Sequence, residues 1–69
     1  MSFQIEVEQE SDGRWLAEIP QLPGALAYGD SADKAVQTVQ ALGLRVLADR
    51  IEHGETVPEG VMELFAVPA

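Results

Sequence analysis

Apolar residues occupy every other position in two runs near the start of the 69-residue chain. The first run consists of Phe3, Ile5 and Val7, and the second of Trp15, Ala17 and Ile19. This period-two pattern is typical of strands with one buried face. Between the runs lies Ser11-Asp12-Gly13, and Asp and Gly are favoured in tight turns. The pattern therefore predicts a β-hairpin.

Pro20 ends the second predicted strand, because proline has no N–H to donate to a ladder. The residues Gln21-Leu22-Pro23-Gly24 form a rigid connector, in which Pro restricts φ and Gly permits a sharp turn. The following Ala25–Tyr28 segment is long enough for a short third strand. We therefore expect an antiparallel three-stranded meander.

A helical pattern follows Gly29-Asp30-Ser31. Its apolar positions recur at spacings of three and four: Ala35, Val36, Val39, Leu42, Val46, Leu47 and Ile51. Such a stripe is typical of an amphipathic helix packed on a sheet. Asp30 or Ser31 can act as N-cap, and His53-Gly54 is a favourable helix end. Gly43 within the stripe indicates either close backbone packing or a tolerated substitution.

A last alternation runs from Val61 to Val67 and predicts a fourth strand. A right-handed crossover after the third strand would place it beside the first, parallel to it. The predicted fold class is α+β, in the order β-β-β-α-β, with the helix on one sheet face. Residues 1–69 have room for a single domain.

The helix leaves the second sheet face uncovered, and several apolar side chains are expected to project from it. These are Leu16, Leu26, Tyr28, Met62 and Leu64. Neighbouring apolar residues on an open face form a patch that suits a partner. The alternative is an irregular strand whose facing is shifted by one residue. Because the core is small and the chain has no cysteine for disulfides, we predict a homodimer.

Twelve acidic residues oppose four basic ones, so the net charge is −8. This charge disfavours binding to nucleic acid, where Lys and Arg must neutralise phosphates. It favours a basic partner, although it can also serve solubility alone. Glu6, Glu8 and Glu18 are the acids expected on the open sheet face. No signal peptide or membrane-spanning run is present, so a cytoplasmic protein is expected.

Four strand acids could in principle serve a metal-dependent nuclease: Glu6, Glu8, Glu18 and Glu63. Such chemistry needs carboxylates that converge on the ions, whereas these alternate with apolar residues as on a solvated face. The single histidine, His53, excludes a multi-histidine zinc site within one chain and is better placed to favour the helix end. We therefore expect no catalytic residue, cofactor or metal.

The segment Asp12–Gly24 resembles the signature hairpin of the HicB-like antitoxin family. The matching residues are Asp12, Gly13, Trp15, Pro20, Leu22, Pro23 and Gly24, continued by Gly29 and Asp30 before the helix. The loop Gly54–Glu59 also resembles the family's Gly-x-x-x-Pro loop. Two positions depart from the pattern, since Ala25 replaces a frequent Cys and Lys34 a usual acid.

The resemblance implies a partial, catalytically inactive ribonuclease-H-like fold. It also implies a partner, because HicB-type antitoxins bind and silence HicA, a small basic toxin that cleaves messenger RNA. Typical members add a C-terminal DNA-binding segment, and this sequence ends after the predicted fourth strand, so no promoter binding is expected. The alternative is an orphan structural or regulatory protein that self-associates and has no toxin.

Overall fold

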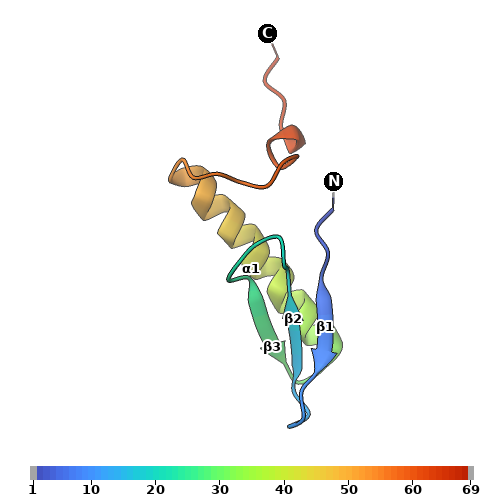
Figure 1. Ribbon diagram of the computed structural model, residues 1–69. Coiled ribbons are helices and arrows are strands. Elements are labelled where there is room, and N and C mark those ends of the chain that lie inside the picture. The colour runs from blue at the N-terminus through green and yellow to red at the C-terminus, as the bar shows by residue number, and fades with distance from the viewer. Residues whose placement is uncertain (1, 69) are drawn as a thin grey trace.

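The computed structural model describes residues 2–68 as a three-stranded sheet, one α-helix and a short 3-10 helix. Figure 1 shows the helix lying across one face of the sheet. The elements are β1 (Glu6–Gln9), β2 (Trp15–Glu18), β3 (Leu26–Gly29), α1 (Ala32–Glu52) and η1 (Met62–Leu64). The α+β class is therefore confirmed.

The sheet is an antiparallel meander in the order β1-β2-β3, as predicted. In the turn between β1 and β2, the N–H of Arg14 donates to the Asp12 carboxylate at 3.0 Å. The ladder begins only at Glu6, later than the alternation starting at Phe3 suggests. Before it, the Gln4 N–H donates to the Gln21 side chain at 2.9 Å and so has a partner outside the sheet.

The helix α1 begins and ends with conventional caps. The Ser31 hydroxyl accepts the N–H of Lys34 at 3.1 Å, so Ser31 rather than Asp30 is the N-cap. His53 is the C-cap, and Gly54 follows with a φ of 68°, a value that suits glycine. The buried positions repeat every four residues: Ala35, Val39, Gly43 and Leu47.

The core lies between α1 and the β2–β3 side of the sheet. Its buried members are Ala17, Ile19, Leu22, Ala25, Ala35, Val39, Leu47 and Val61. Leu22 comes from the connector after β2 and is only 1% exposed. Backbone hydrogen bonds hold this connector in place, including Ile19 N–H to the Ala25 carbonyl at 2.9 Å. The connector thus contributes to the core as well as joining two strands.

The predicted fourth strand over Val61–Val67 is wrong for the described chain. Val61 is buried, but Met62–Leu64 form η1, and the following residues are exposed and outside the sheet. The N–H groups of Glu63 and Leu64 donate to the carbonyls of Gly60 and Val61, so they bond locally. Alternation makes a segment compatible with a strand, whereas pairing requires a neighbouring edge within reach.

The helix packs mainly against β3 and β2 and least against β1. Val7 faces the helix layer, opposite Ala17, yet is 39% exposed. The β1 side of the molecule is therefore the less covered side. Within residues 2–68, no helix combines the length and apolar character that crossing a membrane requires.

Candidate functional site

The face of the sheet opposite α1 carries acids and large apolar side chains in two rows. Ala17 is buried beneath α1 and is paired with Val7 and Ala27, so the alternate positions face away from the helix. One row contains Glu6, Glu18 and Leu26, and the next contains Glu8, Leu16 and Tyr28. We call these six residues the outer face.

Six of the eight residues predicted to bind a partner therefore share one surface. Leu26 and Tyr28 are each more than two-fifths exposed, and Leu16 lies half-buried between Glu8 and Tyr28. The predicted facing of all three strands is confirmed, and the alternative of a shift by one residue is excluded for them. The outer face combines apolar contact area with negative charge.

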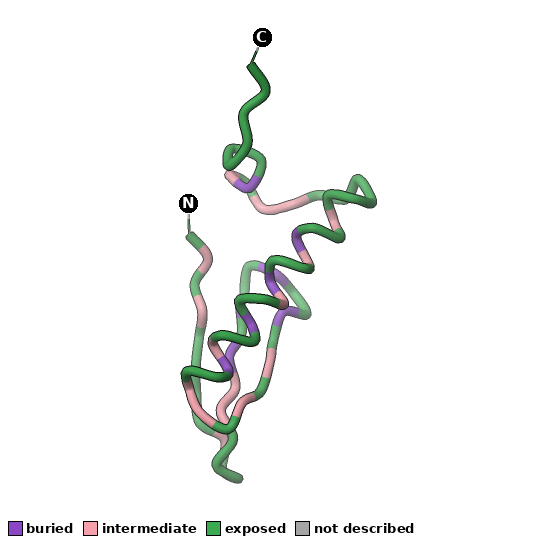
Figure 2. The backbone as a smooth tube through the Cα atoms, turned by 180° about the vertical axis from the view of Figure 1, so that it is seen from behind, coloured by how far each residue is buried: buried purple, intermediate pink, exposed green. Residues whose placement is uncertain are grey.

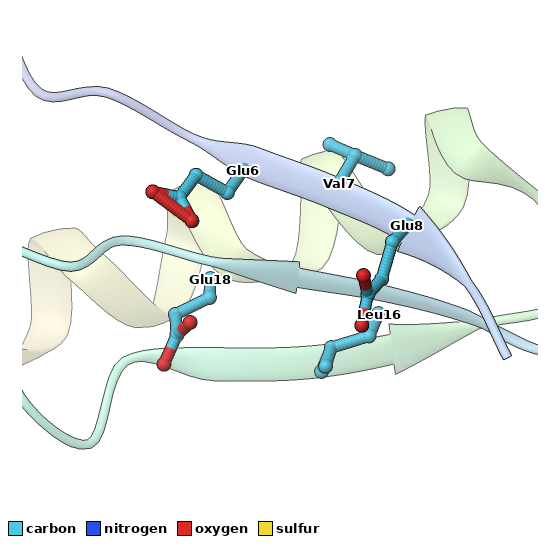
Figure 3. A pocket seen from close by; sticks show the side chains of 5 residues that line it. All are labelled: Glu6, Val7, Glu8, Leu16 and Glu18. Atoms are coloured by element: carbon cyan, nitrogen blue, oxygen red, sulfur yellow. The ribbon is translucent and has the colours of Figure 1, made fainter.

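Glu6 and Glu18 lie directly opposite each other on neighbouring strands. Like charges in this position repel and destabilise the strand pair. Figure 3 shows both side chains, with Glu8, on the side of the sheet away from α1. Together with Val7 and Leu16 they line a shallow hollow of about 260 Å³. A positively charged group placed there would relieve the repulsion.

The turn end of the outer face is held by contacts around Tyr28. The guanidinium of Arg14 lies 4.4 Å from the centroid of the Tyr28 ring, a cation–π geometry. The Tyr28 hydroxyl donates to Glu10 at 3.4 Å. Composition and periodicity do not indicate the Arg14–Tyr28 contact, because it depends on the register that joins β2 to β3.

Arg14 also forms an ion pair with Asp12 at 2.8 Å across the hairpin turn. The pKa of Asp12 is lowered from its ordinary value, first by the hydrogen bond from the Arg14 backbone N–H and then by the Arg14 side chain. Both side chains are more than half exposed, so water screens the pair. Its role is to order the turn rather than to hold a reactive group.

Met62 and Leu64 do not join the outer face, which corrects their predicted position on the sheet. Both lie in η1, because the segment that contains them forms a local turn instead of a strand. Glu63 lies there too, so the four acids considered for nuclease chemistry are not gathered on one sheet. Only Glu6, Glu8 and Glu18 share a surface.

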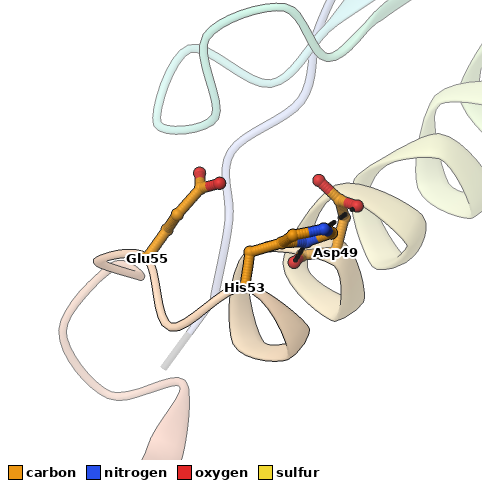
Figure 4. Close-up of side chains that lie close together, drawn as sticks. All are labelled: Asp49, His53 and Glu55. Atoms are coloured by element: carbon orange, nitrogen blue, oxygen red, sulfur yellow. Dashed lines mark hydrogen bonds and ion pairs between the residues drawn. The ribbon is translucent and has the colours of Figure 1, made fainter.

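A second group of polar side chains meets at the end of α1. The possible donor atoms of Asp49, His53 and Glu55 lie within 4.8 Å of one another, and all three residues are exposed (Figure 4). The Nδ1 of His53 lies 2.8 Å from the Asp49 carbonyl and 3.3 Å from its carboxylate. The i, i+4 spacing of Asp49 and His53 could have predicted this contact. The contact lies at the C-terminal end of α1, where His53 is the C-cap.

The chain is similar in sequence to a known protein over nearly its whole length. It is 30% identical over 66 residues to a UPF0150 protein of Archaeoglobus fulgidus, an alignment that covers 93% of this chain and 96% of the relative. The chain belongs to the UPF0150 family. No protein-family model matches the chain, and no solved structure matches it. The alignment spans nearly all of both UPF0150 chains, so it includes the hairpin, the helix and the segment after it.

Proposed function

We propose that this UPF0150 protein is a non-catalytic, HicB-like binding module that neutralises a small basic HicA-type toxin. The toxin would be silenced by occlusion, because the module would cover the basic surface with which it binds RNA. The proposal rests on the resemblance of the hairpin Asp12–Gly24 to HicB-like antitoxins and on the chemistry of the outer face. The observation that carries it is the acidic–apolar composition of a sheet face that α1 leaves open.

The apolar residues of the outer face supply the contact area of the proposed complex. Leu16 and Leu26 lie in adjacent rows, and Tyr28 provides a large ring with a polar end. Aromatic residues of this kind are enriched at protein interfaces. Contacts between apolar surfaces chiefly set how slowly a complex dissociates.

The acids of the outer face supply selectivity and speed of encounter. The Glu6–Glu18 pair is unfavourable in the free protein and becomes favourable when a Lys or Arg of the partner approaches. A surface that binds RNA has such basic side chains. The net charge of −8 attracts the same partner at longer range, within a Debye length of about 8 Å at physiological salt.

The test uses a purified HicA-type toxin and the double variant Glu6→Gln/Glu18→Gln. We expect the association rate constant at low salt to fall by about tenfold, because steering charges act mainly on association. Raising the salt concentration should reduce the difference between the variant and the wild type. Stopped-flow fluorescence of Trp15 measures both effects.

The matched control is Glu52→Gln/Glu59→Gln, which removes the same charge from exposed positions outside the sheet. We expect this control to retain most of the wild-type rate. If both double variants lose the same fraction of the association rate constant, the net charge of the protein accounts for the effect and the position of the acids on the outer face does not. Absence of any complex with the toxin would refute the antitoxin assignment and favour an orphan protein.

A further inference from the structure

Several large apolar side chains in the segment after Val61 are exposed to solvent. We call residues 62–67 the tail. Leu64 and Phe65 are each 67% exposed and Val67 is 94% exposed. After η1 the backbone is extended at Phe65, with φ −123° and ψ 143°. Figures 1 and 2 show the tail leading away from the sheet and helix. The apolar residues after η1 therefore have no strand partner in the described chain.

We call the rest of the described chain, residues 2–61, the body. The body has an apolar groove between α1 and the residues that lead into β1. The groove has a volume of about 540 Å³, and its lining includes Phe3, Ile5, Ile19, Leu22, Leu44 and Leu47. Leu44 is 70% exposed although it belongs to the face of α1 that borders the core. The groove therefore borders buried core residues such as Leu22, and Leu44 is exposed at its wall.

The residues that lead into β1, Phe3 and Ile5, line this groove, so the groove begins at the start of β1. β1 is the first strand of the order β1-β2-β3, so one of its edges has no strand neighbour in the described chain. A strand added at this edge would satisfy its free N–H and C=O groups. If it extended past the start of β1, such a strand would reach Phe3 and Ile5 in the lining of the groove.

We propose that the tail of a second copy of this chain occupies the β1 edge and the groove, in a reciprocal exchange that forms a homodimer. The molecule contains both parts of this interface, because the tail offers exposed apolar side chains that can pair as a strand, and the body offers a free strand edge and an apolar groove. The chain's own tail leads away from its body, whereas a two-fold related copy can present its tail to that body. This inference goes beyond the proposed function and does not depend on it.

The side chains of the tail suit this position. In a strand paired with β1, directing Phe65 and Val67 into the groove leaves Ala66 on the same side as Glu6 and Glu8. Ala66 is uncharged, so it brings no further negative charge beside the acids of β1. Leu64 also lies at the wall of its own chain's groove. The tail therefore starts beside the groove of its own chain and leads away from it after η1 (Figure 1).

Two variants of the full chain test the exchange. Ala66→Pro removes a backbone N–H that the added strand would use, and proline is compatible with an extended, exposed segment. Phe65→Glu/Val67→Glu places charge where the groove is apolar. We expect the wild type to sediment as a dimer at micromolar concentration. Both variants should sediment as monomers, with far-ultraviolet circular dichroism that still reports the helix and sheet.

The control is Ile51→Glu, which adds a charge at an exposed apolar residue near the end of α1. It should remain dimeric. A monomeric wild type would overturn the proposal. So would a dimer that survives both tail variants, because its interface would then lie elsewhere, for example on the outer face.

Cross-linking distinguishes exchange between two copies from a tail that folds back on its own chain. The sequence has no cysteine, so single cysteines can be introduced without competing thiols. Gln4→Cys marks the approach to the β1 edge, and Ala66→Cys marks the tail. A mixture of the two single variants, treated with a short bis-maleimide, should give a covalent dimer. If only the chain that carries both cysteines cross-links, at monomer mass, the tail folds back and the proposal fails.

Discussion

The hairpin and the tail have the same alternating pattern of apolar residues, but only the hairpin is paired and buried. In β2, Ala17 and its neighbours are paired on both sides by β1 and β3 and covered by α1. In the tail, Phe65 and Val67 alternate in the same way and are exposed. The comparison shows that alternation encodes which face of a segment can be buried, whereas the partner depends on what chain topology brings within reach.

The body achieves close packing with small residues. Ala17 and Ala35 are fully buried, so the helix backbone lies near the sheet and little side-chain volume separates the layers. Domains of this length bury only about 60% of the surface of their unfolded chains. Each large buried residue therefore accounts for a substantial part of the stability, and the tail accounts for little of it within one chain.

The largest difference is expected between two identical substitutions, Leu22→Ala in the body and Leu64→Ala in the tail. Leu22 is 1% exposed, and its loss should cost about 2–5 kcal/mol because it removes buried methyl groups and leaves a cavity. Leu64 is mostly exposed, so its substitution should change the free energy of unfolding by less than about 0.5 kcal/mol.

Urea unfolding followed by Trp15 fluorescence measures both values, at a chain concentration too low for association. Trp15 is the single tryptophan and packs against the core, so it reports on the body. Comparable losses in the two variants would show that the tail belongs to the folding unit of its own chain.

A smaller effect is expected from Gly29→Ala. A Cβ at Gly29 would lie 2.5 Å from the backbone nitrogen of Ala35, so the first turn of α1 would have to move away from β3. We expect a loss of about 1–3 kcal/mol, typical of overpacking. The same denaturation experiment measures it.

Gly43→Ala is the matched control for Gly29→Ala. Its Cβ would meet the end of the Ile19 side chain at 2.8 Å, and a side-chain end can rotate away where a backbone cannot. The helix also gains about 1 kcal/mol when alanine replaces glycine. We therefore expect a net change within about 1 kcal/mol. A loss as large as that of Gly29→Ala would mean that the core around Ile19 cannot adjust.

The smallest effect concerns the turn of the hairpin and depends on pH. The pKa of Asp12 is lowered in the fold, so its contribution to stability is present above the unfolded-state pKa and is lost as pH falls through the folded value. Asp12→Asn should be slightly less stable than the wild type at neutral pH. The two should converge in strong acid, where the wild-type carboxyl is protonated.

Urea midpoints at neutral and strongly acidic pH measure this convergence. Glu59→Gln makes the same change in charge outside the hairpin and serves as the control. A stability difference for Asp12→Asn that is the same at both pH values would indicate that the carboxylate charge does not act in the turn.

Local chemistry made much of the body predictable. Asp12 and Gly13 indicate the turn, Pro20 indicates the end of β2, and the spacing from Ala35 to Leu47 indicates which side of α1 is buried. The facing of Glu6, Glu18 and Tyr28 followed from the same period of two. Each signal is local because it concerns residues that are neighbours along one element.

The missed features are either contacts between distant parts of the chain or the absence of such a contact. The sequence places Leu22 in a rigid connector, yet its side chain is buried in the core. The Arg14–Tyr28 contact depends on the β2–β3 register, and η1 forms where a strand was predicted. Local patterns contain no information on which edge or groove a segment meets.

The sequence by itself determined the class of the fold, the hairpin, the limits of the helix and the acidic character of the open face. These features depend on backbone preferences, side-chain alternation and charge, all of which belong to individual residues and their near neighbours. Only the tertiary structure decided that residues 62–67 lie outside the sheet and that one edge of β1 has no strand neighbour in the described chain. Those outcomes depend on whether a segment comes close enough to another to pair with it, and the path of the whole chain decides this.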